Sequence, residues 1–211
     1  MKYFAMLCLL SSILFSDDII LGETRLGFEF TPISSKGYTA PYNLKFKQKA
    51  NLDGNKITLK VFNRHYVLDN GSEYDRLKIW PIVETNYNIF YEGMYDYYSG
   101  DKDTKKYKDI IGLFKKFDNF NVKIGYVWAE KNKYTIITSG NLFKIGKHKL
   151  GFENYNYRDV KTNNYELNLE LQYKYKITKN VDLYAYSVNS YEHSSKISKS
   201  SRIDLGIYYY F

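Results

Sequence analysis

The sequence predicts an all-β fold: a transmembrane, antiparallel, up-and-down β-barrel of twelve strands, or of ten if the weakest segment is not a strand. Three observations lead to this fold class. Apolar and polar residues alternate with a period of two over many short segments, as in strands with lipid on one face and a polar lumen on the other. The connections between these segments are alternately short and long. Beyond the first residues, no stretch approaches the run of about 20 apolar residues that a membrane helix requires.

The N-terminus predicts a secretory signal peptide over residues 1–16. Lys2 precedes an apolar run from Tyr3 to Phe15 that is too short to span a bilayer, and we expect cleavage near Ser16. The only cysteine, Cys8, lies in this run without the small residues that precede a lipid-modified cysteine, so we expect it to be lost on cleavage. Residues 17–211 are then one barrel domain without disulfides, located in the bacterial outer membrane.

Composition agrees with an exported barrel. Aromatic residues make up 18% of the chain, with 24 Tyr and 13 Phe against 3 Pro. Outer-membrane barrels carry aromatic girdles at both interfaces, for which Tyr supplies an apolar ring and a hydrated hydroxyl. The mean hydropathy of −0.50 is too low for a helical membrane protein. The net charge of +8 indicates lipopolysaccharide phosphates or anionic solutes as partners, and not nucleic acid, which an exported chain rarely meets.

Six strands are expected before residue 117. The tight-hairpin signal Asp53-Gly54-Asn55 separates the second from the third. The sixth is the weakest, because the doublets Ile110-Ile111 and Leu113-Phe114 fit a short helix nearly as well as a strand. The expected ranges are 25–30, 41–52, 56–62, 76–83, 87–97 and 107–116.

Six further strands are expected after residue 119. The clearest runs from Tyr165 to Ile177, where apolar residues alternate with Glu, Asn, Gln and Lys. Tight turns are expected at Lys144–Lys147 and Thr178–Asn180. The expected ranges are 120–128, 134–143, 149–157, 165–177, 181–185 and 203–211.

The lengths of the connections alternate along the chain. The connections after even-numbered strands are short, whereas those after odd-numbered strands, such as Tyr98–Lys106 and Asn189–Ser200, are mostly longer and more polar. Short turns at one end and longer loops at the other, with an even strand number, are typical of an outer-membrane barrel with both termini in the periplasm.

The last strand has a pattern of its own. Ile203, Leu205, Ile207, Tyr209 and Phe211 share one face, and Arg202, Asp204 and Gly206 the other. A final strand of this kind, ending on an aromatic residue, resembles the closing strand of outer-membrane barrels. The resemblance implies recognition of this strand by the barrel assembly machinery.

The polar faces of the strands predict the lining of the lumen. Basic residues on three consecutive strands would form a basic wall, and Glu166, Glu170 and Glu29 an acidic wall elsewhere, so that the pore would favour anions modestly. The alternative is that these charges pair with one another and fill the interior. Eight aromatics are expected in the girdles or on the lipid face: Tyr87, Tyr91, Tyr126, Trp128, Tyr173, Tyr175, Tyr209 and Phe211. The basic pore-lining candidates are Lys45, Lys47, Lys49, Lys56, Lys60, Arg64, Arg76 and Lys78.

The stretch from Leu59 to Asp69, followed by Asp75 and Arg76, resembles the arginine- and tyrosine-bearing hairpin of the oligogalacturonate-specific porin family. The resemblance implies a small monomeric porin with twelve strands. This chain departs from the family in having mainly lysine where the family's lumen is rich in arginine, and bidentate recognition of carboxylates is a property of arginine.

Enzymatic and metal chemistry are not indicated. The histidines are His65, His148 and His193, and only His193 has a neighbouring Ser and Glu, in an expected flexible loop that would not hold a nucleophile and base in fixed geometry. We therefore expect no catalysis and no cofactor. The expected function is passive diffusion of small hydrophilic solutes, anionic ones or oligosaccharides among them. The alternatives are a non-conducting barrel whose outer loops bind host or partner molecules, and a soluble exported β-protein.

Overall fold

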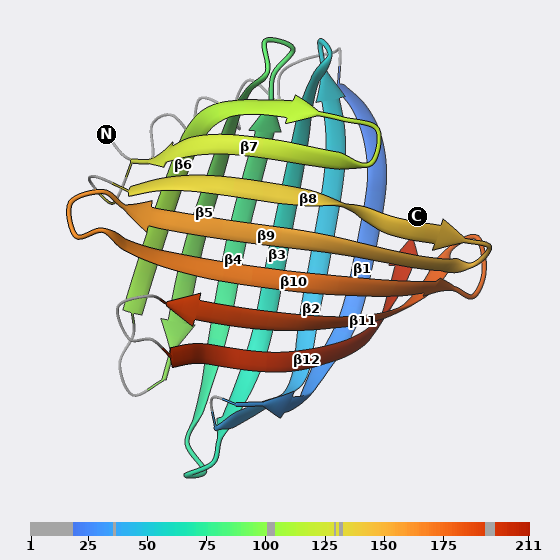
Figure 1. Cartoon of the computed structure of the whole chain (residues 1–211). Helices are drawn as coiled ribbons and strands as arrows, with labels where there is room; N and C mark the ends of the chain where they lie inside the picture. The colour runs from blue at the N-terminus through green and yellow to red at the C-terminus, as the bar shows by residue number, and fades with distance from the viewer. Residues whose placement is uncertain (1–18, 36, 101–103, 129, 131–132, 193–196) are drawn as a thin grey trace.

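The computed structural model describes residues 19–35, 37–100, 104–128, 130, 133–192 and 197–211, which form a closed antiparallel barrel (Figure 1). The expected signal peptide with Cys8, and His193, lie outside the described residues. The strands are β1 (Ile19–Ser34), β2 (Tyr38–Leu52), β3 (Asn55–Leu68), β4 (Glu73–Glu84), β5 (Ile89–Ser99), β6 (Thr104–Lys116), β7 (Phe120–Val127), β8 (Lys133–Ile145), β9 (His148–Asp159), β10 (Asn164–Lys176), β11 (Val181–Glu192) and β12 (Ile197–Tyr210).

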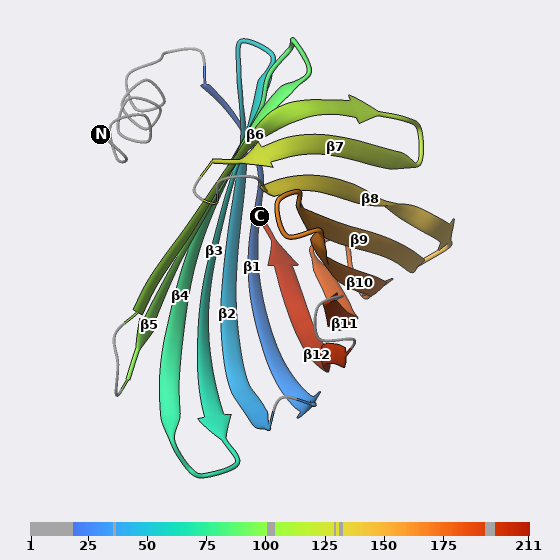
Figure 2. The same cartoon turned by 60° about the vertical axis from the view of Figure 1, so that its left-hand side comes forward.

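Each strand pairs with its neighbours in sequence, and β12 pairs with β1 to close the barrel. Figure 2 shows β1–β5 on one wall and β8–β12 on the other, with β6 and β7 joining the two walls. The structure thus confirms the expected fold class and its larger strand number. Within the described residues, no helix is long and apolar enough to cross a bilayer.

The segment that was hardest to predict, 107–116, belongs to strand β6. Its apolar doublets arise because both faces of this strand are apolar. Ile111 and Leu113 are exposed on the outside, whereas Ile110 is fully buried inside and Phe114 packs against the same interior cluster. Apolar residues on both faces of a strand remove the period of two on which strand prediction depends.

The turns agree with their sequence signals, but the loops at the opposite end are shorter than expected. The β2–β3 turn has Asp53 and Gly54 at φ of 50° and 77°, the left-handed pair that tight hairpins require. At the other end, β5 continues to Ser99, β6 already begins at Thr104, and β11 continues to Glu192. The expected long loops are therefore largely strand, since polar side chains do not prevent backbone pairing beyond the membrane.

The outer surface is mainly apolar along the strands. On β1, Leu26, Phe28 and Phe30 are exposed, while Glu29 between them is completely buried in the interior. Ile203, Ile207 and Tyr209 of β12 are likewise exposed. This is the alternation that lipid on one side and a polar lumen on the other demand.

An exception on the outer face is Asp109 of β6. Its Oδ1 accepts hydrogen bonds from the hydroxyls of Tyr91 (2.7 Å) and Tyr95 (3.0 Å) on β5. Gly93 is the cross-strand partner of Asp109, and a Cβ there would lie 2.8 Å from the Tyr91 hydroxyl oxygen. Because Gly93 has no side chain, the two tyrosine rings have room to cover the Asp109 carboxylate. Their hydrogen bonds offset the free-energy cost of placing this carboxylate on the lipid-facing side of the barrel.

Candidate functional site: the lumen

The interior contains two adjoining cavities. The central cavity, of about 460 Å³, extends among residues of β1–β4 and β7–β12, and the turn-end cavity, of about 490 Å³, lies beside the β2–β3 turn. Five residues line both cavities, which therefore share a boundary inside the barrel: Lys47, Lys60, Asn121, Ser139 and Glu153.

Most of the residues predicted to line a pore face these cavities. Lys49 and Lys56 face the turn-end cavity. Glu166 is on the inward side of β10, where its Oε1 is 3.5 Å from the Asn168 amide, but it lines neither cavity. The predicted residues that line the central cavity are Lys45, Lys47, Lys60, Arg64, Arg76, Lys78 and Glu170.

A buried ionic cluster occupies the interior beside the β1–β12 seam. Glu29 accepts from Lys45 Nζ at 2.6 Å and from Asn43 Nδ2 at 2.8 Å, and the Tyr208 hydroxyl also donates to it. Arg64 reaches Asp204 at 2.9 Å and Glu29 at 3.9 Å. We define the ionic cluster by these residues with their neighbours Thr31, Tyr186 and Arg202.

The ionic cluster corrects the expected position of Glu29. Glu29 was expected on an acidic wall apart from the basic residues, but it lies among them and neutralises part of their charge. Strand alternation correctly places Glu29 inside. It does not give the strand register, which places Glu29 opposite Asn43 of β2 and Asn43 opposite Arg64 of β3.

Other basic residues of the wall rest on aromatic rings instead of carboxylates. Lys60 Nζ and Lys78 Nζ lie 4.0 Å and 4.2 Å from the ring centre of Trp80. Among the described residues, neither amine forms an ion pair within 4.0 Å. A ring face stabilises a cation without neutralising it, so these charges remain available to the cavity.

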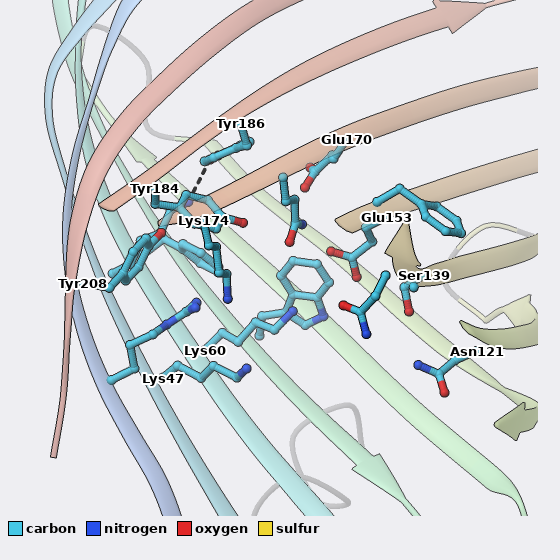
Figure 3. Close-up of a pocket in the computed structure, with 18 of the residues that line it drawn as sticks. Lys47, Lys60, Asn121, Ser139, Glu153, Glu170, Lys174, Tyr184, Tyr186 and Tyr208 are labelled. Atoms are coloured by element: carbon cyan, nitrogen blue, oxygen red, sulfur yellow. Dashed lines mark hydrogen bonds between the residues drawn. The ribbon is translucent and has the colours of Figure 1, made fainter. Parts of the chain in front are cut away.

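The acidic wall consists of Glu153 on β9 and Glu170 on β10. The two residues are direct cross-strand partners, and both line the central cavity. Figure 3 shows their carboxylates extending into the cavity from the side opposite the amines of Lys47 and Lys60. The structure therefore brings Glu170 together with Glu153, a residue that was not among the predicted site residues.

Sequence reasoning also missed Arg25 and Lys174, which line the central cavity. Arg25 lies 4.2 Å from the ring centre of Tyr208, and Lys174 Nζ 5.4 Å from that of Tyr184. Arg25 and Lys174 lie on the polar side of alternating strands, so a complete list of those positions would have included them. Glu153 shares the inward side of β9 with Tyr155 and Tyr157, so alternation gives no such signal for it.

An apolar cluster fills the other side of the interior. Inward-facing side chains of β4–β9 pack together there, and Trp80 Nε1 donates to Glu92 Oε1 at 2.9 Å at its edge. The cluster narrows the lumen because its side chains occupy space that water would otherwise fill. Its members are Trp80, Ile82, Phe90, Met94, Ile110, Val127, Ile137, Tyr155 and Tyr157.

The lumen has the chemistry of a charged passage. Within the described residues, no group of three His, Cys, Asp or Glu side chains could hold a metal ion. What the cavities offer a solute is fixed charge of both signs, together with amide and hydroxyl groups such as those of Asn121 and Ser139. These groups can bind and orient a polar solute.

Solved structures are similar to this chain over most of its length. No protein-family model matches the sequence, and no curated protein matches it. Among solved structures, the KdgM porin shares 14% identity over 90% of this chain and 99% of its own, with a TM-score of 0.48. Omp33 of Acinetobacter baumannii shares 14% identity over 93% and 100%, with a TM-score of 0.48. Outer membrane phospholipase A from Escherichia coli shares 15% identity over 89% of each chain, with a TM-score of 0.46. At such identities the likeness concerns the fold alone, which serves both porins and an enzyme.

Proposed function

We propose that this chain is a porin of the bacterial outer membrane, through which small hydrophilic solutes diffuse passively. The observation that carries the proposal is the pair of adjoining, charge-lined cavities inside a closed barrel whose outer surface is mainly apolar. A barrel that served only as a membrane anchor could fill this space with apolar side chains, which would avoid the cost of placing charges there.

The charge of the central cavity favours anions. Among the described residues, nine Lys and Arg side chains but three carboxylates line it. Two further carboxylates, Glu29 and Asp204, are buried against Lys45, Arg64 and Arg202 and offset part of this excess. The remainder should attract anions modestly into the pore.

The first experiment is single-channel recording of the refolded mature protein in a planar bilayer, with the reversal potential measured across a salt gradient. Discrete current steps with an anion-selective reversal potential are expected. A cation-selective reversal would refute the basic wall as the controlling charge. The absence of current steps from a protein that has inserted into the bilayer would contradict the porin function.

The alternative is a non-conducting barrel that binds partners through its outer loops. The apolar cluster favours it, because it removes one side of the lumen from the water path. The connections at the loop end, such as residues 69–72 and 160–163, are short and offer little surface to a partner. They therefore disfavour the partner-binding alternative.

The orientation of the side chains has its own test. Leu169 follows the outward positions of β10, whereas Lys47 faces the cavities. Leu169→Arg should block insertion into lipid vesicles, since a charge on the lipid face costs about 2–4 kcal/mol at mid-membrane. Lys47→Glu should insert normally. Similar behaviour of the two variants would contradict the assignment of faces.

The proposed partners follow from the same function. Lipid and lipopolysaccharide would surround the barrel, and the assembly machinery would recognise β12 together with the exposed Phe211 that follows it. We expect a monomer without enzymatic activity or cofactor. Sedimentation in detergent, corrected for bound detergent, tests the monomer.

A further inference from the structure

We propose that the lumen selects zwitterionic solutes, such as amino acids and short peptides, over neutral solutes of the same size. The inference rests on the proposed porin function and names a substrate class for it. It follows from the arrangement of uncompensated charges across the central cavity.

The two carboxylates of the acidic wall occupy an unusual position. Glu153 and Glu170 are directly opposite each other on β9 and β10, and both face inward. Like charges at such positions destabilise a sheet. The Tyr155 hydroxyl donates to Glu153 at 3.0 Å, but among the described residues neither carboxylate has a cation within 4.0 Å. A cationic group brought by a solute would relieve this repulsion.

Two lysine side chains face these carboxylates from the other side of the central cavity. Lys60 rests on the ring of Trp80, and Lys47 Nζ is 3.7 Å from Glu23, at the outer limit of an ion pair. In Figure 3 the amines of Lys47 and Lys60 point into the cavity from β2 and β3, facing the two carboxylates. An anionic group of a solute can therefore be accommodated on this side.

Together the two sides create a transverse field. A zwitterion can turn its ammonium group towards Glu153 and Glu170 and its carboxylate towards Lys47 and Lys60, and so gains on both sides. A simple anion gains at one wall and is repelled at the other, while a neutral solute gains little from either. Low-dielectric walls focus such fields and raise the local concentration of a matching solute.

The experiment compares two solutes in a liposome-swelling assay with the full mature protein. Glycylglycine is zwitterionic at neutral pH, and N-acetylglycinamide is a neutral molecule of similar size. We expect glycylglycine to enter faster by roughly twofold to tenfold. The ratio of the two rates should fall towards one in the double variant Glu153→Gln/Glu170→Gln, which keeps side-chain size and removes the charge.

A matched control removes the same charge elsewhere. Glu73 and Asp75 are half exposed or more and contact His65 beside the β3–β4 turn, outside both cavities. The double variant Glu73→Gln/Asp75→Asn should keep the wild-type ratio. If the lumen variant does not fold, potassium chloride at equal concentration inside and outside the wild-type vesicles serves instead. Salt screens the field, so the ratio should decrease.

The outcomes separate the two proposals. Current steps in a bilayer with equal entry of both solutes would leave the porin function intact and overturn the zwitterion preference. A preference that persists in the Glu153→Gln/Glu170→Gln variant, or that the control variant abolishes equally, would also overturn it. A protein that inserts but passes neither ions nor solutes would overturn the porin function and this inference with it.

Discussion

The two sides of the lumen are filled by opposite chemistry. Beside the β1–β12 seam, the ionic cluster packs charged groups that satisfy one another, as in the pair of Glu29 with Lys45. On the β4–β9 side, the apolar cluster consists mainly of apolar and aromatic side chains, and the buried Glu92 with Lys123 lies at its edge. The central cavity remains where neither packing reaches. The charges available to a solute are therefore those that remain without a partner in the ionic cluster.

The largest expected effect comes from the ionic cluster. Glu29→Ala would leave Lys45 and Arg64 without one of their carboxylates in the interior, and Asn43 without its acceptor. Removing one partner of a buried ion pair costs about 3–5 kcal/mol. We expect the free energy of unfolding in detergent, measured by urea titration, to decrease by that amount.

The control for this variant is an ion pair at the rim. Lys133 and Glu130 form a pair in which each side chain is about a third exposed. Exposed pairs contribute roughly 0–1 kcal/mol, so Lys133→Ala should change the unfolding free energy little. Equal losses in the two variants would mean that the interior of the ionic cluster is hydrated like the rim.

The next effect concerns the apolar cluster. Phe90 is fully buried within it, and Phe90→Ala should cost about 3 kcal/mol, at the lower end for such truncations because water can enter the new space. Unlike Glu29→Ala, this variant should raise the single-channel conductance, since it widens the lumen. An unchanged or lower conductance would show that the apolar cluster does not border the conducting path.

The smallest effect is expected at the boundary between the two sides. Trp80→Phe removes the indole donor to Glu92 and reduces the ring beneath Lys60 and Lys78. Glu92 keeps Lys123 at 3.6 Å, so the loss in unfolding free energy should be about 1–2 kcal/mol. We expect stronger anion selectivity as well, because the two amines become more mobile. A reversal potential equal to that of the wild type would contradict this role of Trp80.

Sequence reasoning predicted the barrel and much of its lining, for a clear physical reason. Lipid on one face and a polar interior on the other impose a period of two, and Lys45 or Lys60 can be assigned to the interior from that period alone. The same rule fails where the interior is itself apolar, as at Ile110 and Phe114.

The partners of a side chain on the neighbouring strands could not be predicted. Glu29 meets Lys45, and Glu153 meets Glu170, through strand register, which the alternation of one strand does not contain. Loop lengths were overestimated for a related reason. Polar residues at the rim, such as Ser99 and Thr104, give no apolar signal although their backbone remains paired.

The position of the ionic cluster implies an order of events in folding. Its hydrogen bonds join β1 with β12, and Tyr208 and Glu29 are 179 positions apart in the chain. The apolar cluster, by contrast, is built from strands that follow one another along the chain. Contacts over long sequence separations close the largest loops and tend to form late. The contacts of the ionic cluster would therefore form only when β1 and β12 pair and close the barrel. We expect its loss to speed the opening of the finished barrel more than it slows its assembly.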